Sequence, residues 1–312
     1  MAETCILTFG DPDSYSAGFA DACINLTITG AGDFKARLTR LKLKDLEVSL
    51  CCENLPRFAC VSLPTERTFL SFPVDADSLI SDGFTLRSGD VVLHGRGRPT
   101  HQQTNGACQW GLIALSPGVL GSCSKALTGR TITPPHTSKI LRPAPAEALR
   151  FQRLFAKACR LAERQKLAPE AARALERELL HATINCLAAN ETGDNPKTRL
   201  HHGAVIARFE EAISKRFDQK LSMSALCAEI GVPERTLRMC CTEFFGVSPT
   251  RYLLLRRLNK ARAALRRADP STTSVSEVAR NHQFLELGRF AVTYRITFGE
   301  SPSVTLQQAP QS

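Results

Sequence analysis

The stretch from residue 249 to residue 268 limits the possible folds of this chain more than any other. Ser248 can cap a helix, Pro249 suits its first turn, and Pro270 disfavours helical geometry in the residue before it. Four apolar residues recur at helical spacing and predict one buried stripe: Leu254, Leu258, Ala261 and Leu265. Seven basic residues and no acidic one surround that stripe: Arg251, Arg256, Arg257, Lys260, Arg262, Arg266 and Arg267. Such a helix would be about 30 Å long, close to the ~34 Å of one DNA turn.

Residues 221–246, which precede this helix, have the pattern of a helix-turn-helix unit. Ser222 can cap a short first helix, Gly231 suits the tight turn, and Pro233 can begin the second helix. The apolar residues of the second helix are expected to face inward, which leaves four outward residues as candidates for DNA contact: Arg235, Arg238, Met239 and Thr242.

The same pattern recurs about fifty residues later. Ser274 can cap a first helix at 275–279, Phe284 can fill the angle between the helices, and residues 288–298 form the second helix. Its outward residues are Arg289, Val292 and Arg295. Two such units on one basic helix predict a protein that sets two helices into successive major grooves on one face of DNA.

Together these residues resemble the AraC/XylS family of bacterial transcription regulators. The resemblance covers about one hundred residues, Val205 to Thr305, and rests on Leu226, Gly231, Leu237, Phe244, Gly246, Ser248, Pro249, Tyr252, Arg257, Leu258, Ala261, Arg262, Leu265, Val278, Ala279, Phe284, Phe290, Tyr294, Phe298, Gly299, Ser301 and Pro302. It implies a seven-helix DNA-binding domain with two subdomains. It also implies an activator whose partners are double-stranded DNA and RNA polymerase.

Three departures from the family pattern affect the expected mechanism. Gln283 stands where the family has a glycine before the phenylalanine, so the turn must be built differently or be strained. Val292 replaces an arginine that is common on the DNA face, and Met239 occupies a frequent arginine position. We therefore expect Arg235 and Arg238 in the first unit to carry most direct base reading.

Two questions stay open for the other candidate residues. The second unit would either read a thymine methyl through Val292 or mainly hold the DNA backbone through Arg289 and Arg295. Arg257 would contact a phosphate or brace the fold. Exposed arginines on helices are also often merely solvated, and only the helix-turn-helix context favours DNA contact here.

The charge distribution agrees with DNA binding. The 312 residues carry a net charge of +10; residues 201–312 hold 16 basic and 10 acidic side chains, whereas residues 1–142 hold 14 and 13. We expect neither a signal peptide nor a transmembrane helix, and therefore no membrane partner and a cytoplasmic location. The twelve scattered cysteines suit reduced thiols. Buried structural thiols are favoured over redox sensing at Cys51, Cys52 or Cys108.

The N-terminal residues read mainly as β-structure. Short alternating segments between residues 31 and 120 predict a small β-barrel or jelly roll, whereas residues 1–25 look like a loose arm. The family resemblance implies a cupin-like sensory barrel here. A candidate effector pocket inside it would be lined by Phe58, Phe69, Phe72 and Trp110. The same aromatic residues could equally form the core.

Two helices are predicted after a Pro/Ser/Thr-rich connector at 128–145. They span residues 147–165 and 169–189, and the short join between them predicts antiparallel packing. Their apolar stripes would form either an intrachain core or a homodimer face. Residues 191–198 read as a linker. The expected domains are 1–142 for effector sensing, 143–200 for a helical hairpin with linker and possible dimerisation, and 201–312 for DNA binding.

The expected fold class is therefore α+β, and the expected function is sequence-specific transcription regulation without catalysis. A small molecule of unknown identity would bind the N-terminal barrel, and neither a metal nor a cofactor is expected. Two alternatives remain. The barrel could serve only dimerisation, or it could be a cupin-like metalloenzyme tethered to a DNA-binding domain. The segment from His94 to His101 could serve the latter, although a basic turn explains it as well.

Overall fold

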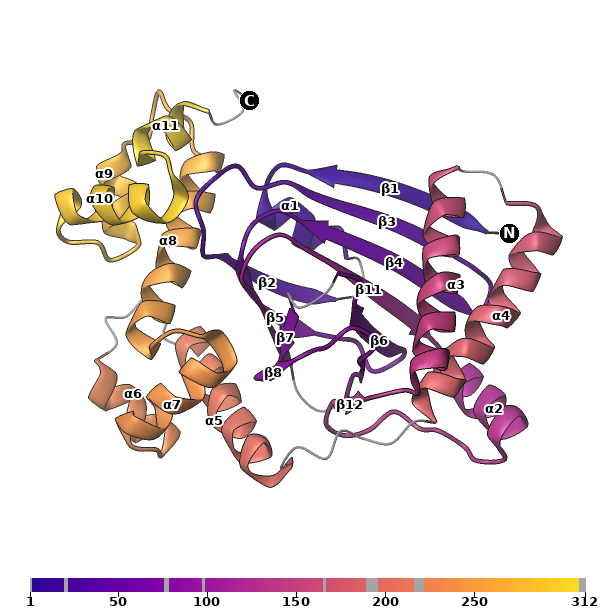
Figure 1. Ribbon diagram of the computed structural model, residues 1–312. Helices are drawn as coiled ribbons and strands as arrows, with labels where there is room; N and C mark the ends of the chain where they lie inside the picture. The colour runs from indigo at the N-terminus through magenta and orange to yellow at the C-terminus, as the bar shows by residue number, and fades with distance from the viewer. Residues whose placement is uncertain are drawn as a thin grey trace.

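The computed structural model describes residues 2–19, 22–75, 79–96, 99–164, 167–188, 196–215 and 222–308. It is an α+β structure in which two β-sheets come first along the chain and an all-helical part comes last (Figure 1). Helices α3 and α4 lie against the side of the sheets that faces away from the C-terminal helices.

The larger sheet has seven strands, and its neighbours pair antiparallel. In spatial order they are β1 (Glu3–Phe9), β3 (Ala36–Lys42), β4 (Leu46–Glu53), β11 (Cys108–Leu115), β6 (Thr68–Pro73), β9 (Val91–Leu93) and β12 (Lys139–Leu141). Alternate side chains of its strands face opposite layers. Leu41, Val48 and Ile113 pack toward the helices, whereas Leu38, Cys51 and Trp110 pack toward the second sheet.

The second sheet has five strands. Their spatial order is β2 (Cys23–Ile28), β5 (Arg57–Ser62), β10 (Thr100–Thr104), β7 (Leu79–Ser81) and β8 (Phe84–Thr85). The strands of the described residues thus form two separate sheets, so the expected closed barrel is wrong. The double sheet matches the jelly-roll form of the prediction, in which inward side chains of both layers share one core.

The expectation of a loose N-terminal arm is also wrong. β1 pairs along its whole length with β3, α1 (Pro12–Ala17) follows it, and β2 begins before residue 25. β1 lies at the edge of its sheet and is only partly buried, so its hydrophobic pattern is weak. Two further elements were not predicted, namely α2 (Pro117–Thr128) and, inside the supposed connector, β12.

Helices α3 (Pro145–Glu163) and α4 (Pro169–Leu187) complete the main core of the N-terminal part. Phe151 and Phe155 of α3 meet Phe72 of β6 edge-on at centroid distances of 4.8 Å. The stripe expected on α4 is buried within the same cluster. The buried faces of α3 and α4 therefore belong to an intrachain core, whereas Leu149, which was expected in the stripe of α3, is 48% exposed. Homodimerisation through these helices stays a prediction.

The C-terminal part consists of two helical clusters joined by the basic helix α8 (Pro249–Arg267) (Figure 1). The first cluster contains α5 (Pro196–Lys215), α6 (Met223–Ile230) and α7 (Glu234–Phe245). The second contains α9 (Val275–Asn281), α10 (Leu287–Phe298) and α11 (Pro302–Gln307). Leu258, Ala261 and Leu265 of α8 are buried as the periodicity predicted, and Leu254 is partly buried.

The N-terminal sheets contact both helical clusters. Phe58 of β5 packs against Phe245 and Tyr252 of the first cluster, at centroid distances of 5.7 and 5.6 Å. The backbone N–H of Gly32 donates to the carbonyl of Phe298 in the second cluster at 3.1 Å. Between the two points, Asn259 of α8 exchanges two 2.9 Å hydrogen bonds with the backbone of Ile28.

Within the described ranges, no helix combines the length and the apolar character that crossing a membrane would require. Most of the linker predicted at residues 191–198 lies outside the described residues.

Candidate nucleic-acid interface

The first helix-turn-helix unit is formed by α6 and α7. Ser222 caps α6 by accepting a hydrogen bond from the N–H of Ala225 at 3.2 Å, as its position predicted. Gly231 adopts a left-handed conformation with φ of 68°, which glycine reaches at little cost and which turns the chain sharply into α7. Leu237, Cys240, Cys241 and Phe244 are buried in the cluster as predicted.

The outward face of α7 presents the four predicted DNA-contact residues together. Arg235, Arg238, Met239 and Thr242 are all exposed. Arg238 donates to Glu234 one helical turn earlier at 2.9 Å. An exposed pair of this kind is worth only about 0.3–0.5 kcal/mol. Arg238 can therefore leave Glu234 at small cost for a base, where a bidentate contact contributes about 1–3 kcal/mol of discrimination.

The second unit is formed by α9 and α10 around a strained turn. Gln283 has a φ of 63°, the left-handed conformation that the missing glycine predicted. The next residue, Phe284, is 8% exposed and fills the angle between the helices, with its ring 4.7 Å from that of Phe290. The second unit therefore has a left-handed non-glycine residue at its turn, a conformation that costs backbone strain.

The outward face of α10 carries the three predicted residues of the second unit. Arg289, Val292 and Arg295 are exposed, and Val292 is 60% exposed. Phe290, Tyr294 and Phe298 of the same helix are buried. The structure thus presents candidate residues of both units on exposed helix faces. The two units lie at opposite ends of α8 (Figure 1).

Two of the six arginines of α8 are paired with glutamates inside the C-terminal part, which the sequence did not reveal. Arg256 pairs with Glu210 of α5, which also accepts the hydroxyl of Tyr252. Arg262 is 4% exposed and donates to Glu300 at 2.7 Å. Each of these two pairs ties one cluster to α8. Glu210 and Glu300 are distant in sequence from their partners, so spacing along the helix could not identify the pairs.

Arg257 also braces the second unit. Its guanidinium carbon lies 5.2 Å from the centroid of Phe284. Burial lowers the pKa of Arg257 from its usual range. The arginine therefore stabilises the residue that sets the angle of the second unit, and the bracing role that the sequence left open is the one that the structure supports.

The four aromatic residues expected to line one effector pocket are not brought together. Phe58 packs on the first helical cluster, and Phe72 packs on α3. Trp110 donates its Nε1–H to the buried carboxylate of Glu53 at 2.8 Å. Only Phe69 lines the cavity described next, so the expected shared pocket is wrong. Neighbouring strands distribute these side chains among different layers, because successive residues of a strand face opposite sides.

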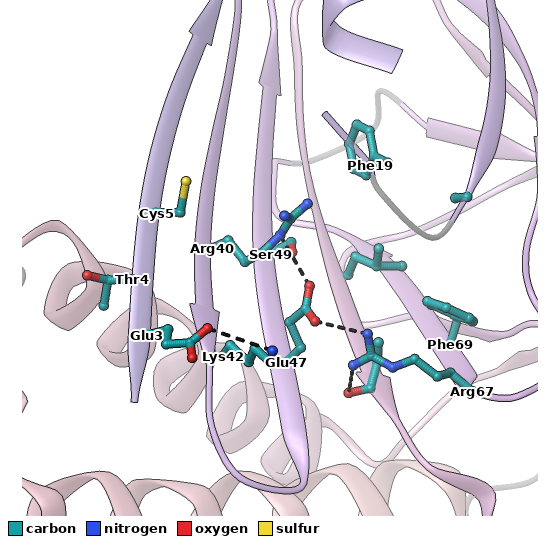
Figure 2. Close-up of a pocket in the computed structure, with 13 residues that line it drawn as sticks. Glu3, Thr4, Cys5, Phe19, Arg40, Lys42, Glu47, Ser49, Arg67 and Phe69 are labelled. Atoms are coloured by element: carbon teal, nitrogen blue, oxygen red, sulfur yellow. Dashed lines mark hydrogen bonds and ion pairs between the residues drawn. The ribbon is translucent and has the colours of Figure 1, made fainter. Parts of the chain in front are cut away.

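A cavity of about 410 Å³ lies instead beside strands β1, β3, β4 and β11 (Figure 2). Glu47 lies between two guanidinium groups, 3.1 Å from Arg40 and 2.9 Å from Arg67. Phe19 and Phe69 supply apolar surface. The combination of ring faces with a charged cluster suits a small polar ligand better than a purely apolar one.

The histidines of the segment from residue 94 to residue 101 have structural partners. His94 lies between the hydroxyls of Ser71 and Thr100 at 2.8 and 3.1 Å. Burial lowers the pKa of His94 to about 4. For His101, burial alone would lower the pKa, but hydrogen bonding to Asp82 and Cys60 raises it to about 10. Among the described residues, no group of three or more His, Cys, Asp or Glu side chains could hold a metal ion.

Two of the three cysteines considered for redox sensing are buried, and Cys52 is partly exposed. Cys51 and Cys108 are buried, and burial raises the pKa of Cys51 and raises that of Cys108 to about 12. Because the thiolate is the reactive form, burial and a raised pKa favour a structural role for these two thiols.

The geometry defines a class of protein: one that presents two helix-turn-helix units on a shared basic helix, with both exposed helix faces available to DNA. A helix-turn-helix domain family matches residues 226–308. The chain belongs to the AraC/XylS family of transcription regulators.

Two curated relatives show the extent of the similarity. The probable thc operon regulatory protein of Rhodococcus erythropolis is 40% identical over 92 residues, which cover 30% of this chain and 28% of that protein. The XylDLEGF operon transcriptional activator of Pseudomonas putida is 28% identical over 147 residues, which cover 39% of this chain and 46% of that protein. The matched stretches thus span less than half the length of these two relatives.

Two solved structures are also similar. A probable AraC family transcriptional regulator from Rhodopseudomonas palustris is 32% identical, with a TM-score of 0.31, and the match covers 34% of this chain and 98% of that chain. The AraC-like transcriptional activator CuxR is 15% identical, with a TM-score of 0.45, and the match covers 82% of this chain and 95% of that chain.

Proposed function

We propose that this protein is a cytoplasmic, sequence-specific DNA-binding activator of transcription. The observation that carries the proposal is the presence of two helix-turn-helix units whose outward helix faces are both exposed. The first unit would read bases through Arg235 and Arg238, with Met239 and Thr242 beside them. The second would contact DNA through Arg289, Val292 and Arg295. Arg257 would position the second unit.

RNA polymerase and a second copy of the chain are proposed as further partners, and no catalytic step is proposed. The names of the relatives support activation, since one is described as an operon transcriptional activator. Residues 201–312 would bind DNA, residues 1–142 would sense a signal, and residues 143–200 would connect the two.

Control by a small molecule in the N-terminal part has a physical route in this structure. The cavity beside Glu47 could hold the molecule, and the sheets touch both helical clusters through Phe58 and Gly32. A ligand shifts an equilibrium only if it binds one arrangement better than another. Given such a preference, the contacts that join the sensing part to both units would transmit it, because a change of sheet position would move the units relative to each other.

The first test is binding of the full-length protein to a pool of genomic DNA fragments with excess nonspecific DNA, followed by footprinting. We expect two protected segments about one helical turn apart. The double variant Arg235→Ala/Arg238→Ala should lose the preferred sequence while retaining salt-sensitive binding. Binding of the wild-type protein without any sequence preference would overturn the proposal.

The control function needs a separate test. Thermal unfolding of the full-length protein with a panel of small carboxylic acids and sugars should reveal compounds that raise the melting temperature and change operator affinity. Arg67→Ala should abolish both effects, because Arg67 borders the cavity. A compound whose effects survive in Arg67→Ala would show that the effector binds elsewhere.

A further inference from the structure

The second helix of each unit, α7 in the first and α10 in the second, can be aligned by length and by the glycine at its end. α7 and α10 each contain 12 residues, and each ends at a left-handed glycine, Gly246 or Gly299. The same alignment superposes buried residues on buried residues: Leu237 on Phe290, Cys241 on Tyr294, and Phe245 on Phe298. One aligned pair of C-terminal glycines and three aligned core positions therefore fix a single register.

We call the first unit proximal and the second unit distal, and we call the DNA segments that they would contact by the same names. The register shows which residues of the distal unit stand where the proximal unit has its candidate DNA-contact residues. Arg235 corresponds to Gly288, Arg238 to Ala291, Met239 to Val292, and Thr242 to Arg295. The two long cationic side chains of α7 are replaced on α10 by glycine and alanine, and the methionine of α7 is replaced by valine. At these four aligned positions α10 is thus apolar except at Arg295.

The apolar surface of α10 is open and continues beyond the aligned positions. Val292 is 60% exposed, Ile296 one turn later is 71% exposed, and Leu285 before the helix is 78% exposed. Residues four apart on a helix are surface neighbours, so Val292 and Ile296 form one patch. An exposed apolar patch on a soluble protein commonly marks an interaction site.

The charges around the patch favour DNA as its occupant. Arg289 and Arg295 are exposed one turn before and one turn after Val292, and residues 287–298 contain no acidic residue. Arginines on both sides of an apolar centre match phosphates on both sides of a groove. The major groove admits a helix, and the apolar group that its bases offer there is the methyl of thymine.

We propose that the second unit recognises thymine methyl groups, chiefly through Val292 with Ala291 beside it, and that Gly288 lets α10 approach the bases closely. The inference rests on the proposed DNA-binding function and names the sequence class that its distal half would select. Distal segments would be rich in thymine at the contacted positions, whereas proximal segments would carry guanine opposite Arg235 and Arg238.

Gly288 supports the close approach independently. Its backbone is helical, and a methyl group added there would meet no atom within 4 Å. Alanine is favoured over glycine in helices, so the fold itself gives no reason for glycine here. A groove lying close against the first turn of α10 would give one.

The test begins with DNA sites selected by the full-length wild-type protein from a random pool. Each thymine of the distal segment is then replaced by deoxyuridine, which lacks only the 5-methyl group. We expect affinity to fall about fourfold at each contacted thymine, the ratio for burying one methyl group. In Val292→Ala the same replacement should cost little, because the valine that contacts the methyl is missing.

Met239→Ala is the matched control, since Met239 is the exposed counterpart of Val292 on α7. It should leave the distal uracil effect unchanged. Gly288→Ala should melt no lower than the wild type yet bind the selected site several-fold more weakly. Both variants change exposed positions, so folding is not at risk.

The outcomes separate the inference from the proposed function. If no preferred sequence emerges from the pool, the proposed function fails and the inference falls with it. If a sequence emerges but distal uracil costs nothing, thymine reading by the second unit is wrong. If distal uracil costs the same in Val292→Ala as in the wild type, the assignment of the methyl contact to Val292 is wrong. Unchanged affinity in Gly288→Ala would refute the close approach.

Discussion

Helices α7 and α10 have the same length and the same pattern of buried residues, but their exposed surfaces differ in chemistry. Both have 12 residues, both end at a left-handed glycine, and both bury residues at corresponding positions. Yet α7 exposes Arg235 and Arg238, whereas α10 exposes Val292 and Ile296. The comparison shows that the buried residues that build each unit are separate from the exposed residues that we propose to read DNA, so two copies of one frame can present different chemistry to the bases.

The two units also differ in how they are held. The first packs an aromatic cluster against the N-terminal sheet, where Phe58 meets Phe245 and Tyr252. Among the described residues, the second meets the N-terminal part through the backbone hydrogen bond from Gly32 to Phe298, and the end of α8 beside it adds polar contacts of Arg266 with Gly10 and of Arg267 with Asp13. The first unit is therefore the one whose position depends more strongly on the N-terminal part.

The largest expected effect tests how α8 holds the second unit. Arg262→Met should lower the free energy of unfolding by about 3–5 kcal/mol, because it leaves Glu300 without its buried partner. Thermal or urea unfolding of the full-length protein measures the change. The control is Arg267→Met, since its pair with Asp13 is exposed at both ends and should contribute about 0–1 kcal/mol. Equal losses in the two variants would contradict the bracing role of Arg262.

Base reading by the first unit gives the next effect. Arg238→Ala should weaken specific DNA binding by about 1–3 kcal/mol and relax selection at one proximal base, because a bidentate contact with guanine is lost. Repeating the sequence selection with the variant measures both changes. Arg153→Ala removes an exposed arginine of α3 and should leave affinity unchanged. Relaxed selection in the distal segment instead would reverse the assignment of the units.

The strained turn of the second unit offers a stabilising change. Gln283→Gly should raise the free energy of unfolding by about 1 kcal/mol, because glycine adopts a φ of 63° without steric cost. Gly231→Gln places the same residue at the left-handed turn of the first unit and should destabilise by a similar amount. A lower melting temperature for Gln283→Gly would show that the glutamine side chain contributes more than its backbone strain costs.

The smallest effect concerns backbone contact by the second unit. Arg295→Gln should weaken binding to all sequences alike and reduce the slope of log affinity against log salt by about 1, because one phosphate contact is lost. Titrations at several salt concentrations, on selected and unrelated DNA, measure it. A loss confined to one base position would mean that Arg295 reads a base.

Much of the candidate interface was predictable because its signals are local. The caps at Ser222, Ser248 and Ser274, the glycine turn at Gly231 and the apolar periodicity of α8 depend on residues within a few turns of one another. The strain at Gln283 was predictable for the same reason, since the position demands a left-handed backbone whatever lies around it.

The N-terminal sheets were less predictable because pairing across the molecule decides them. β10 contains two glutamines, a histidine and two threonines, yet all five residues are buried. Arg57 donates to Gln102, and Asp82 accepts from the backbone N–H of His101. Polar residues enter a core only when distant groups satisfy them, and a strand of this kind has no hydrophobic pattern to detect.

The sequence by itself determined two helix-turn-helix units on a basic helix, because caps, turns and helical periodicity are properties of short stretches. Tertiary structure alone decided what the charges of that helix do and where the N-terminal aromatics lie. Arg256 and Arg262 pair with glutamates that are remote in the chain. Phe58 packs against the first helical cluster rather than in the expected pocket. These ion pairs and packing contacts depend on which surfaces meet, and only the folded chain brings those surfaces together.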